Sequence, residues 1–374
     1  MCDMAFADKF VGMSATRKPS RVRALILATA LTLMPLTACS GGGTKSETDT
    51  RDIPFKPRLA GGGTIVPLTD SASYDPADAS NDGRWVAYVD YVGEETKLFL
   101  TDTKTGKVRA SNVTVTDYPI AISGDGSCVV FTRPSKAGDA AWLWEIASDK
   151  KMRIGPTTGS WEASVSNDCQ TVLFPAFKKG LLLLDRKTHT LTTVAPKDVP
   201  VMYSQISGNG QWAVYREIDS GRAALWSRAT NTTTYLPFNG LANVDISTDG
   251  NTVLVSRVGK VSSVAKRAAV YDRRTKRVTL SPRPMYAEAI SPDGTAVFGV
   301  RHIARSVTTD EDDRDQVERW DIRKNQITAL TPLESYISGW HVAAVSNSQV
   351  VFTGVDLTLG EPDATRIWRW QAKD

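Results

Sequence analysis

A short turn that begins with serine and leads into an apolar strand recurs along nearly the whole chain of 374 residues. Its clearest copy is Ser291-Pro292-Asp293-Gly294, which is followed by the apolar run Ala296-Val297-Phe298. The serines of the seven copies are Ser80, Ser123, Ser166, Ser207, Ser247, Ser291 and Ser346, so the successive gaps are 43, 43, 41, 40, 44 and 55 residues. A period in the low forties with several strands per repeat is typical of a β-propeller.

Each repeat contains four short apolar segments with roughly alternating polarity. In the first repeat these are Tyr74 to Ala79, Arg84 to Asp90, Lys97 to Thr101 and Lys107 to Val113. The third and fourth segments are joined by a polar loop that ends at Gly106, as in a β-hairpin. The sequence therefore predicts four antiparallel strands in every blade.

The two ends of the repeat array predict how the ring closes. The chain stops after a third strand, Arg366 to Trp370, while an unassigned strand, Thr64 to Leu68, precedes the first repeat. One shared blade would leave no exposed sheet edge at the closure. We therefore expect an all-β protein, a single seven-bladed propeller over residues 61–374, in which the N-terminal strand completes the last blade.

Residues 1–38 have the pattern of an export signal. A basic cluster that includes Arg21 and Arg23 precedes the apolar run from Ala24 to Leu36, which is too short to span a bilayer stably. The run ends at Leu36-Thr37-Ala38-Cys39, which resembles the lipobox of bacterial lipoproteins. This resemblance implies a lipid attached to Cys39 and an exported protein anchored to the membrane, facing the periplasm or the cell exterior. Either Met1 or Met13 is the start.

Residues 39–60 are predicted to form a flexible tether, because Gly41-Gly42-Gly43 and the polar run from Thr44 to Asp52 offer almost nothing to bury. The net charge of +4 falls mostly on the signal, whose five Lys or Arg and two Asp residues contribute +3. A nearly neutral body gives no electrostatic reason to expect nucleic acid as a partner.

The phrase Ile290-Ser291-Pro292-Asp293-Gly294 followed by an apolar strand is similar to the repeat of TolB-like, WD-like β-propellers. The resemblance extends over residues from about 62 to 372, with one degenerate copy at Ser346. Proteins of this kind include envelope interaction proteins, propeller domains of peptidases and a few sugar-degrading enzymes, so the resemblance implies the fold and leaves the function open.

Residues that could carry chemistry are few. The three histidines are His189, His302 and His341, and the repeat pattern places the first at the opposite end of the disc from the other two. We therefore expect no metal site, no cofactor and no catalytic set of known spacing. The acidic run from Thr309 to Asp315 lacks the pattern of a calcium loop and is predicted to be a solvated insertion in the sixth blade.

Two cysteines remain in the predicted mature body, Cys128 and Cys169. They occur near the same turn in neighbouring repeats, and Cys169 replaces the turn glycine itself. In an exported protein such a pair is a candidate disulfide. A pair of buried thiols is the alternative, because a bond requires the two Cα atoms to lie within about 7 Å.

Aromatic residues precede the turn serine by four to six positions in six repeats. They are Tyr74, Tyr118, Trp161, Tyr203, Tyr286 and Trp340, while the fifth repeat has Asn243 instead. If the first strand of each blade lines the central channel, these rings form a candidate binding rim at its mouth, close to the acidic insertion and to a basic loop with Arg257, Lys260, Lys266 and Arg267. The alternative is that they wedge neighbouring blades apart.

Two hypotheses for function follow. The favoured one is non-catalytic: a membrane-anchored lipoprotein whose propeller binds another envelope protein. The alternative is a propeller that binds or degrades a polysaccharide, with rim aromatics stacking on sugar rings and a carboxylate such as Glu162 or Glu288 beside them. No pairing of a general acid with a base can be identified from spacing.

Overall fold

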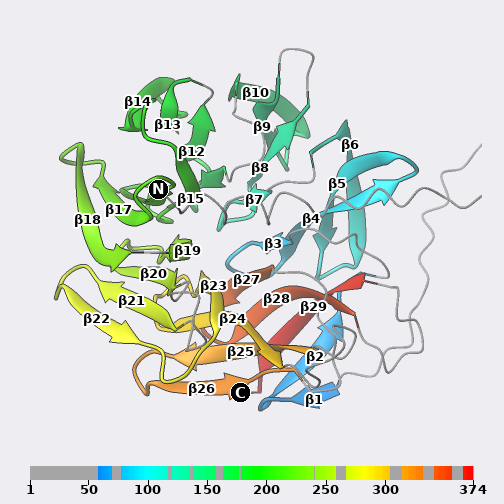
Figure 1. Ribbon diagram of the computed structural model, residues 1–374. Coiled ribbons are helices and arrows are strands. Elements are labelled where there is room, and N and C mark those ends of the chain that lie inside the picture. The colour runs from blue at the N-terminus through cyan, green and yellow to red at the C-terminus, as the bar shows by residue number, and fades with distance from the viewer. Residues whose placement is uncertain are drawn as a thin grey trace, which may run out of the picture. The chain divides into compact units, whose positions relative to one another are not determined.

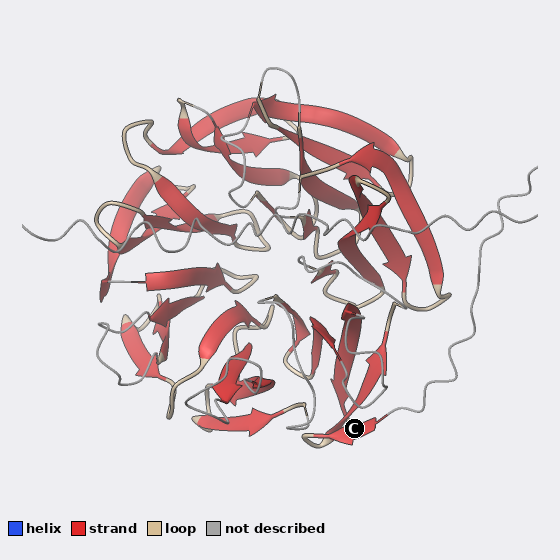
Figure 2. Cartoon of the chain, turned by 45° about the vertical axis from the view of Figure 1, so that its right-hand side comes forward, coloured by secondary structure: helices blue, strands red, loops and turns tan. Residues whose placement is uncertain are grey.

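The computed structural model describes residues 58–69, 77–116, 120–134, 138–156, 163–176, 178–239, 241–257, 267–303, 314–331, 341–355 and 365–373. These residues form a ring of seven antiparallel sheets (Figures 1 and 2). All their regular elements are strands, so the described part of the chain holds no helix with the length and apolar character that crossing a bilayer requires. The predicted all-β, seven-bladed architecture is confirmed.

Six of the sheets have four strands each, in chain order from the centre of the ring outwards (Figure 1). Blade 1 comprises β3 (Asp78–Ala79), β4 (Trp85–Val92), β5 (Glu95–Asp102) and β6 (Lys107–Thr114). Blade 2 comprises β7 (Ala121–Ile122), β8 (Cys128–Arg133), β9 (Ala140–Glu145) and β10 (Lys150–Pro156). Blade 3 comprises β11 (Ser164–Val165), β12 (Thr171–Ala176), β13 (Gly180–Asp185) and β14 (Thr190–Ala195). Blade 4 comprises β15 (Val201–Ile206), β16 (Trp212–Glu217), β17 (Arg222–Ser227) and β18 (Thr232–Asn239). Blade 5 comprises β19 (Leu241–Ile246), β20 (Thr252–Arg257), β21 (Ala268–Asp272) and β22 (Arg277–Leu280). Blade 6 comprises β23 (Tyr286–Ile290), β24 (Ala296–Ile303), β25 (Arg314–Asp321) and β26 (Gln326–Ala329).

Blade 7 closes the ring with strands from both ends of the chain. It contains β27 (Val342–Ser346), β28 (Gln349–Val355), β29 (Thr365–Ala372), β2 (Gly63–Pro67) and β1 (Arg58–Ala60). The pairing of β2 with β29, in which Ile65 lies opposite Trp370, is the predicted closure.

The outermost strand of blade 7, β1, is a departure from the sequence prediction, which assigned residues 39–60 to a tether. The sheet begins at Arg58 because Gly61 and Gly62, with φ of 59° and 78°, form a two-residue turn that pairs Ala60 with Gly63. Two consecutive positive φ angles are the signature of a tight hairpin turn, and glycine adopts them without strain. The glycine pair resembles a linker in the sequence and acts as a hairpin in the structure.

Within the described residues, the hydrophobic core forms seven clusters, one between each pair of neighbouring blades. The cluster between blades 1 and 2 contains Leu98, Leu100, Phe131 and Trp144, all almost fully buried. The last cluster joins blade 7 to blade 1, so the ring is packed all the way round. Each sheet buries both faces, and this explains why the second and third strands are apolar almost throughout.

The repeated turn is held by its serine. The Ser291 hydroxyl donates to Asp293 Oδ1 over 2.6 Å and accepts the backbone N–H of Ala296 over 2.9 Å. The same two contacts occur in the turns that begin at Ser80, Ser123, Ser166, Ser207 and Ser247. All six serines are 0–1% exposed, which accounts for the motif as a structural device.

The sulfur atoms of Cys128 and Cys169 are bonded in the structure, with Cα atoms 6.1 Å apart. The bond joins β8 of blade 2 to the turn before β12 of blade 3. Cys169 has φ of 59° and thus fills the glycine position of its turn in the glycine conformation.

Candidate binding face

The ring has two ends, which we call the turn face and the loop face. The turn face carries the seven serine turns and the connections between third and fourth strands. The loop face carries the connections between second and third strands and those between blades. Consecutive blades also contact each other through their innermost strands around the central axis (Figure 1).

The centre of the turn face is closed by the turns themselves. Backbone hydrogen bonds of 2.8–2.9 Å link neighbouring turns, from Asn81 N to Gly124 O, from Asn167 N to Gly208 O, and so on to Pro292 O. A Cβ added to Gly124 would lie 2.5 Å from side-chain atoms of both Asn81 and Asn167. Gly208 of blade 4 also lies close to the Asn167 side chain, so the turns of blades 1 to 4 pack tightly around it. We therefore look for the candidate site towards the loop face.

The channel wall is held by side chains two residues before the turn serine. Asp78 Oδ2 accepts the N–H of Ile122 over 2.9 Å, and Asp245 Oδ2 accepts that of Ile290 over 2.8 Å. The hydroxyl of Ser164 accepts an N–H from blade 4 in the same way, over 2.9 Å. These side chains tie blade 1 to blade 2, blade 3 to blade 4 and blade 5 to blade 6.

The two channel aspartates have unusual acidities. Burial raises the pKa of Asp78 to about 6 and that of Asp245 to about 7, although two backbone N–H groups donate to each carboxyl group. The charge of Asp78 raises the pKa of Asp245 further, so the two groups interact across the ring from blades 1 and 5. Removal from water, more than hydrogen bonding, sets the pKa of these two carboxyl groups.

Glu288, one of the carboxylates considered for catalysis, serves a similar purpose. Its Oε2 accepts the N–H of Val342 in blade 7 over 2.7 Å, and the residue is 9% exposed. The other, Glu162, lies outside the described residues. The carboxylate of Glu288 is thus engaged in joining blades 6 and 7.

The structure separates the histidines as the repeat pattern predicts. His189 has φ of 57° in the turn between β13 and β14, on the turn face. His302 in β24 and His341 just before β27 lie towards the loop face, and burial lowers the pKa of His341 to about 4. Within the described part of the chain, no three His, Cys, Asp or Glu side chains group closely enough to hold a metal ion.

Two members of the predicted aromatic rim fall within the described residues, Tyr203 and Tyr286, and both are half-buried. Tyr286 is the first residue of β23, at its loop-face end, and Tyr203 is the third residue of β15, in the half of that strand nearer the loop face. Tyr203 also packs against the core cluster between blades 4 and 5, as the wedge alternative predicts. The other four, Tyr74, Tyr118, Trp161 and Trp340, lie outside the described residues, and the rim stays a prediction.

Tyr203 has a strained backbone. Its φ is 51°, in the left-handed region, and it belongs to a β-bulge in which Tyr203 and Ser204 together lie opposite Tyr215. A bulky residue in that region costs roughly 1–2 kcal/mol, and bulges often redirect a side chain beside a binding site. The bulge turns the Tyr203 ring towards blade 5.

Arg216 lies beside this bulge, opposite Met202 in the sheet. Within the described residues it forms no ion pair, its Nη1 donates to Met202 Sδ over 3.4 Å, and its buried Nε has no partner. Burial lowers the pKa of Arg216, and the nearby Tyr203 side chain partly opposes that shift. A half-buried guanidinium without an anion is energetically unfavourable unless a ligand completes it.

Large apolar side chains are exposed at two hairpin tips of the loop face. Tyr91 and Val92, at the end of β4, are 52% and 46% exposed, and Ile218, just after β16, is 42% exposed. Hairpin tips need polar or turn-forming residues for their own stability, so these side chains are not explained by the fold.

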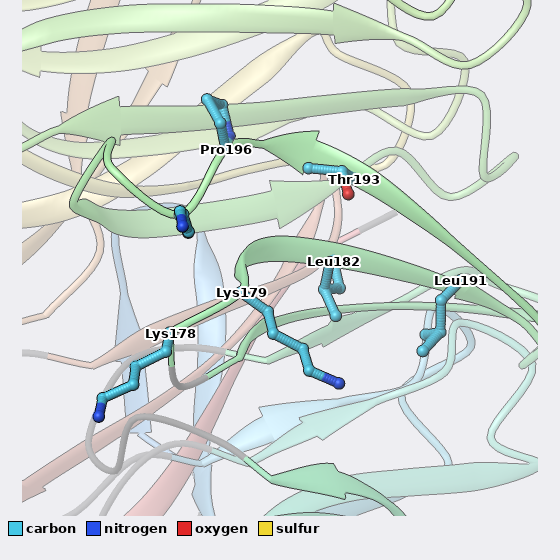
Figure 3. A pocket seen from close by; sticks show the side chains of 7 residues that line it. Lys178, Lys179, Leu182, Leu191, Thr193 and Pro196 are labelled. Carbon is cyan, nitrogen blue, oxygen red and sulfur yellow. The ribbon is translucent and has the colours of Figure 1, made fainter.

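A shallow hollow with a basic rim lies at the outer part of blade 3 (Figure 3). It is lined by Lys178, Lys179, Leu182, Leu191, Thr193, Pro196 and Lys197. The three lysines lie on the loop-face connections, where they add positive charge near blade 3. Of the predicted charged loops, Arg314 and Asp315 belong to β25 and Arg257 to β20, whereas most of the acidic insertion, Lys260 and Lys266 lie outside the described residues.

Comparison with known proteins bears on the fold only. No protein-family model matches the chain, and no curated protein matches it. An oligogalacturonate lyase in complex with manganese has a TM-score of 0.62 at 11% identity, covering 86% of this chain and 96% of its own. The propeller domain of the Trilobed protease from Pyrococcus furiosus has a TM-score of 0.59 at 16% identity, covering 81% and 98%. These similarities show a β-propeller.

TolB from Acinetobacter baumannii is a more distant match in structure, with a TM-score of 0.48 at 17% identity. The match covers 67% of this chain, and the chain spans 64% of the length of that protein.

Sequence reasoning missed both the ties in the channel wall and Arg216. The ties had a signal, because Asp78, Ser164 and Asp245 all stand two residues before their turn serine. Arg216 had none, since arginine at the end of a second strand is ordinary. Its isolation depends on which side chains of blades 4 and 5 surround it.

Proposed function

We propose that this protein is an exported lipoprotein, held to the membrane through Cys39, whose propeller binds another envelope protein through the loop face without catalysis. The observation that carries the proposal is the exposure of Tyr91, Val92 and Ile218 at the hairpin tips of that face. Aromatic and aliphatic side chains of this kind form the centres of protein interfaces. The lipobox resemblance and the length of the predicted tether support a location at the membrane surface.

The proposal is tested by capture with the full chain in detergent. We expect the wild-type protein to retain a defined protein from solubilised envelope, and the double variant Tyr91→Ser, Val92→Ser to lose it at least tenfold. Val108→Ser is the matched control, because Val108 lies in the same blade with 51% exposure on the outer strand β6. Equal retention by all three proteins would remove the loop face as the binding surface.

A polysaccharide is the second candidate ligand. Support comes from the likeness in fold to an oligogalacturonate lyase and from the predicted aromatic rim. The hydrogen bond between Glu288 and Val342 weakens the case for catalysis, because it occupies one of the two carboxylates proposed for that role. Binding of the full chain to defined oligosaccharides on a glycan array, with no protein captured, would favour this candidate.

A further inference from the structure

On the loop face, the guanidinium of Arg216 has a buried Nε without a hydrogen-bond partner and forms no ion pair within the described residues. The other inner-face charges described above each accept backbone N–H groups from their own or the next blade. Within the described residues, Arg216 instead donates to the weak acceptor Met202 Sδ, and its Nε is buried without a partner. A guanidinium carries five N–H donors, and within the described residues only Nη1 of Arg216 has a protein partner.

The surroundings of Arg216 suggest a binding site more than a packing defect. On β16 the side chains of Trp212 and Val214 face blade 5, and Arg216 continues that side towards the loop face. The bulge brings Tyr203 to the same place at the cost of a left-handed backbone. Backbone strain at an aromatic residue and an unpaired cation next to it both cost free energy. They are typical of a binding site in which a ligand offsets these two costs.

We propose that Arg216, with Tyr203 beside it, binds a single carboxylate from an acidic segment of the partner protein; this rests on the proposed function. The planar guanidinium fits a carboxylate with two parallel hydrogen bonds. One positive charge matches a carboxylate better than a dianionic phosphate. The exposed Tyr91, Val92 and Ile218 on the same face suit apolar side chains of a peptide better than a sugar chain.

Arg369 provides a matched control. Its Nε is likewise buried without a partner, and burial likewise lowers its pKa. It lies in β29, between Val351 of β28 and Val66 of β2, four residues beyond the loop-face end of that strand. If the loss of any desolvated arginine weakened binding, both Arg216→Met and Arg369→Met would show the effect. Loss of the proposed site would appear only in Arg216→Met.

The test is selection of a displayed random heptapeptide library on the full chain in detergent. We expect enrichment of Asp or Glu at one position by the wild type and by Arg369→Met, and no such enrichment by Arg216→Met. The selected peptide should bind Arg216→Met at least tenfold more weakly than it binds the wild type. A peptide in which the enriched Asp or Glu is replaced by Asn or Gln should bind the wild type at least tenfold more weakly than the selected peptide does. Arg216→Lys should recover only part of the affinity, because lysine keeps the positive charge but cannot donate the two parallel hydrogen bonds of a guanidinium.

Three outcomes would overturn the inference. They are no acidic enrichment by the wild type, acidic enrichment that persists in Arg216→Met, and a binding site that takes oligouronides while rejecting all peptides. The proposed function fails separately: if the wild type captures an envelope protein and Arg216→Met captures it equally well, only the role of Arg216 is lost.

Discussion

Arg216 on the loop face differs from the arginines that join neighbouring blades on the turn face. On the turn face, the guanidinium of Arg186 reaches from blade 3 to Glu145 of blade 2 over 2.6 Å, and Arg228 of blade 4 bonds Asp185 of blade 3. On the loop face, Arg216 has no anion in the described part of the chain. Ion pairs join neighbouring blades on the turn face, and on the loop-face connection between blades 5 and 6 Arg283 also pairs with Glu318. Arg216 departs from this pattern within the described residues, and we look for function there.

The largest expected effect concerns the disulfide near the turn face. Replacing both Cys128 and Cys169 by Ser should lower the free energy of unfolding by about 4 kcal/mol, because the bond closes a loop with a sequence separation of 41. Urea unfolding of the variant, of the reduced wild type and of the oxidised wild type measures this difference in the free energy of unfolding. Binding to the loop face should be unchanged under native conditions. A stability loss below about 1 kcal/mol would mean that the non-covalent contacts of blades 2 and 3 suffice.

The channel wall lies between the two faces and gives the next effect, which depends on pH. Asp245 has a folded pKa near 7 against an ordinary value of 3.8, so the folded state binds the proton more tightly. Its contribution to stability is present at low pH and is lost as pH rises from about 4 through 7. The loss is on the order of 4 kcal/mol, since one pKa unit is worth about 1.4 kcal/mol.

Asp245→Asn separates this contribution from those of other groups. Near pH 5 we expect the variant to be less stable than the wild type, because asparagine has one oxygen fewer to accept a backbone N–H. Near pH 8, where the wild type has lost the contribution of Asp245, we expect the variant to be as stable or more stable. His341, whose pKa is lowered to about 4 by burial, acts in the opposite sense, because its stabilisation grows as pH rises from about 4 to 6.5. The difference between variant and wild type cancels that contribution. Parallel stability curves from pH 4 to pH 8 would refute the assignment.

The sequence predicted the fold because its signals were local and repeated. The turns at Ser80 to Ser291 need serine, Asp or Asn, and glycine for their own geometry, so they mark the blades directly. The strand Thr64 to Leu68 could be assigned to blade 7 by counting. The candidate site was less predictable, because the partners of Arg216 and the bulge at Tyr203 arise from contacts between blades, which spacing along the chain does not encode.

A third prediction tests the paired arginines directly. Arg228→Met should destabilise the protein by about 2 kcal/mol, because Asp185, with 20% of its side chain exposed, would lose a charge-assisted hydrogen bond. The pKa of Asp185 is lowered by the N–H of Thr188 first and by Arg228 to a lesser degree. Its stabilisation is therefore present above about pH 4 and falls as pH drops, and the variant should show a smaller fall. Chemical denaturation at pH 3 and pH 7 checks both points.

The smallest effect has the opposite sign and completes the comparison. Arg216→Met should leave stability unchanged or raise it by up to about 1 kcal/mol, because methionine fills similar space without a desolvated charge. The same variant should lose the acidic peptide, so stability and binding would move in opposite directions at one residue. Thermal unfolding of Arg216→Met and Arg228→Met, measured side by side, checks the difference in sign. A loss of 2 kcal/mol or more for Arg216→Met would show that its guanidinium is structural, and the loop face would then be no different from the turn face.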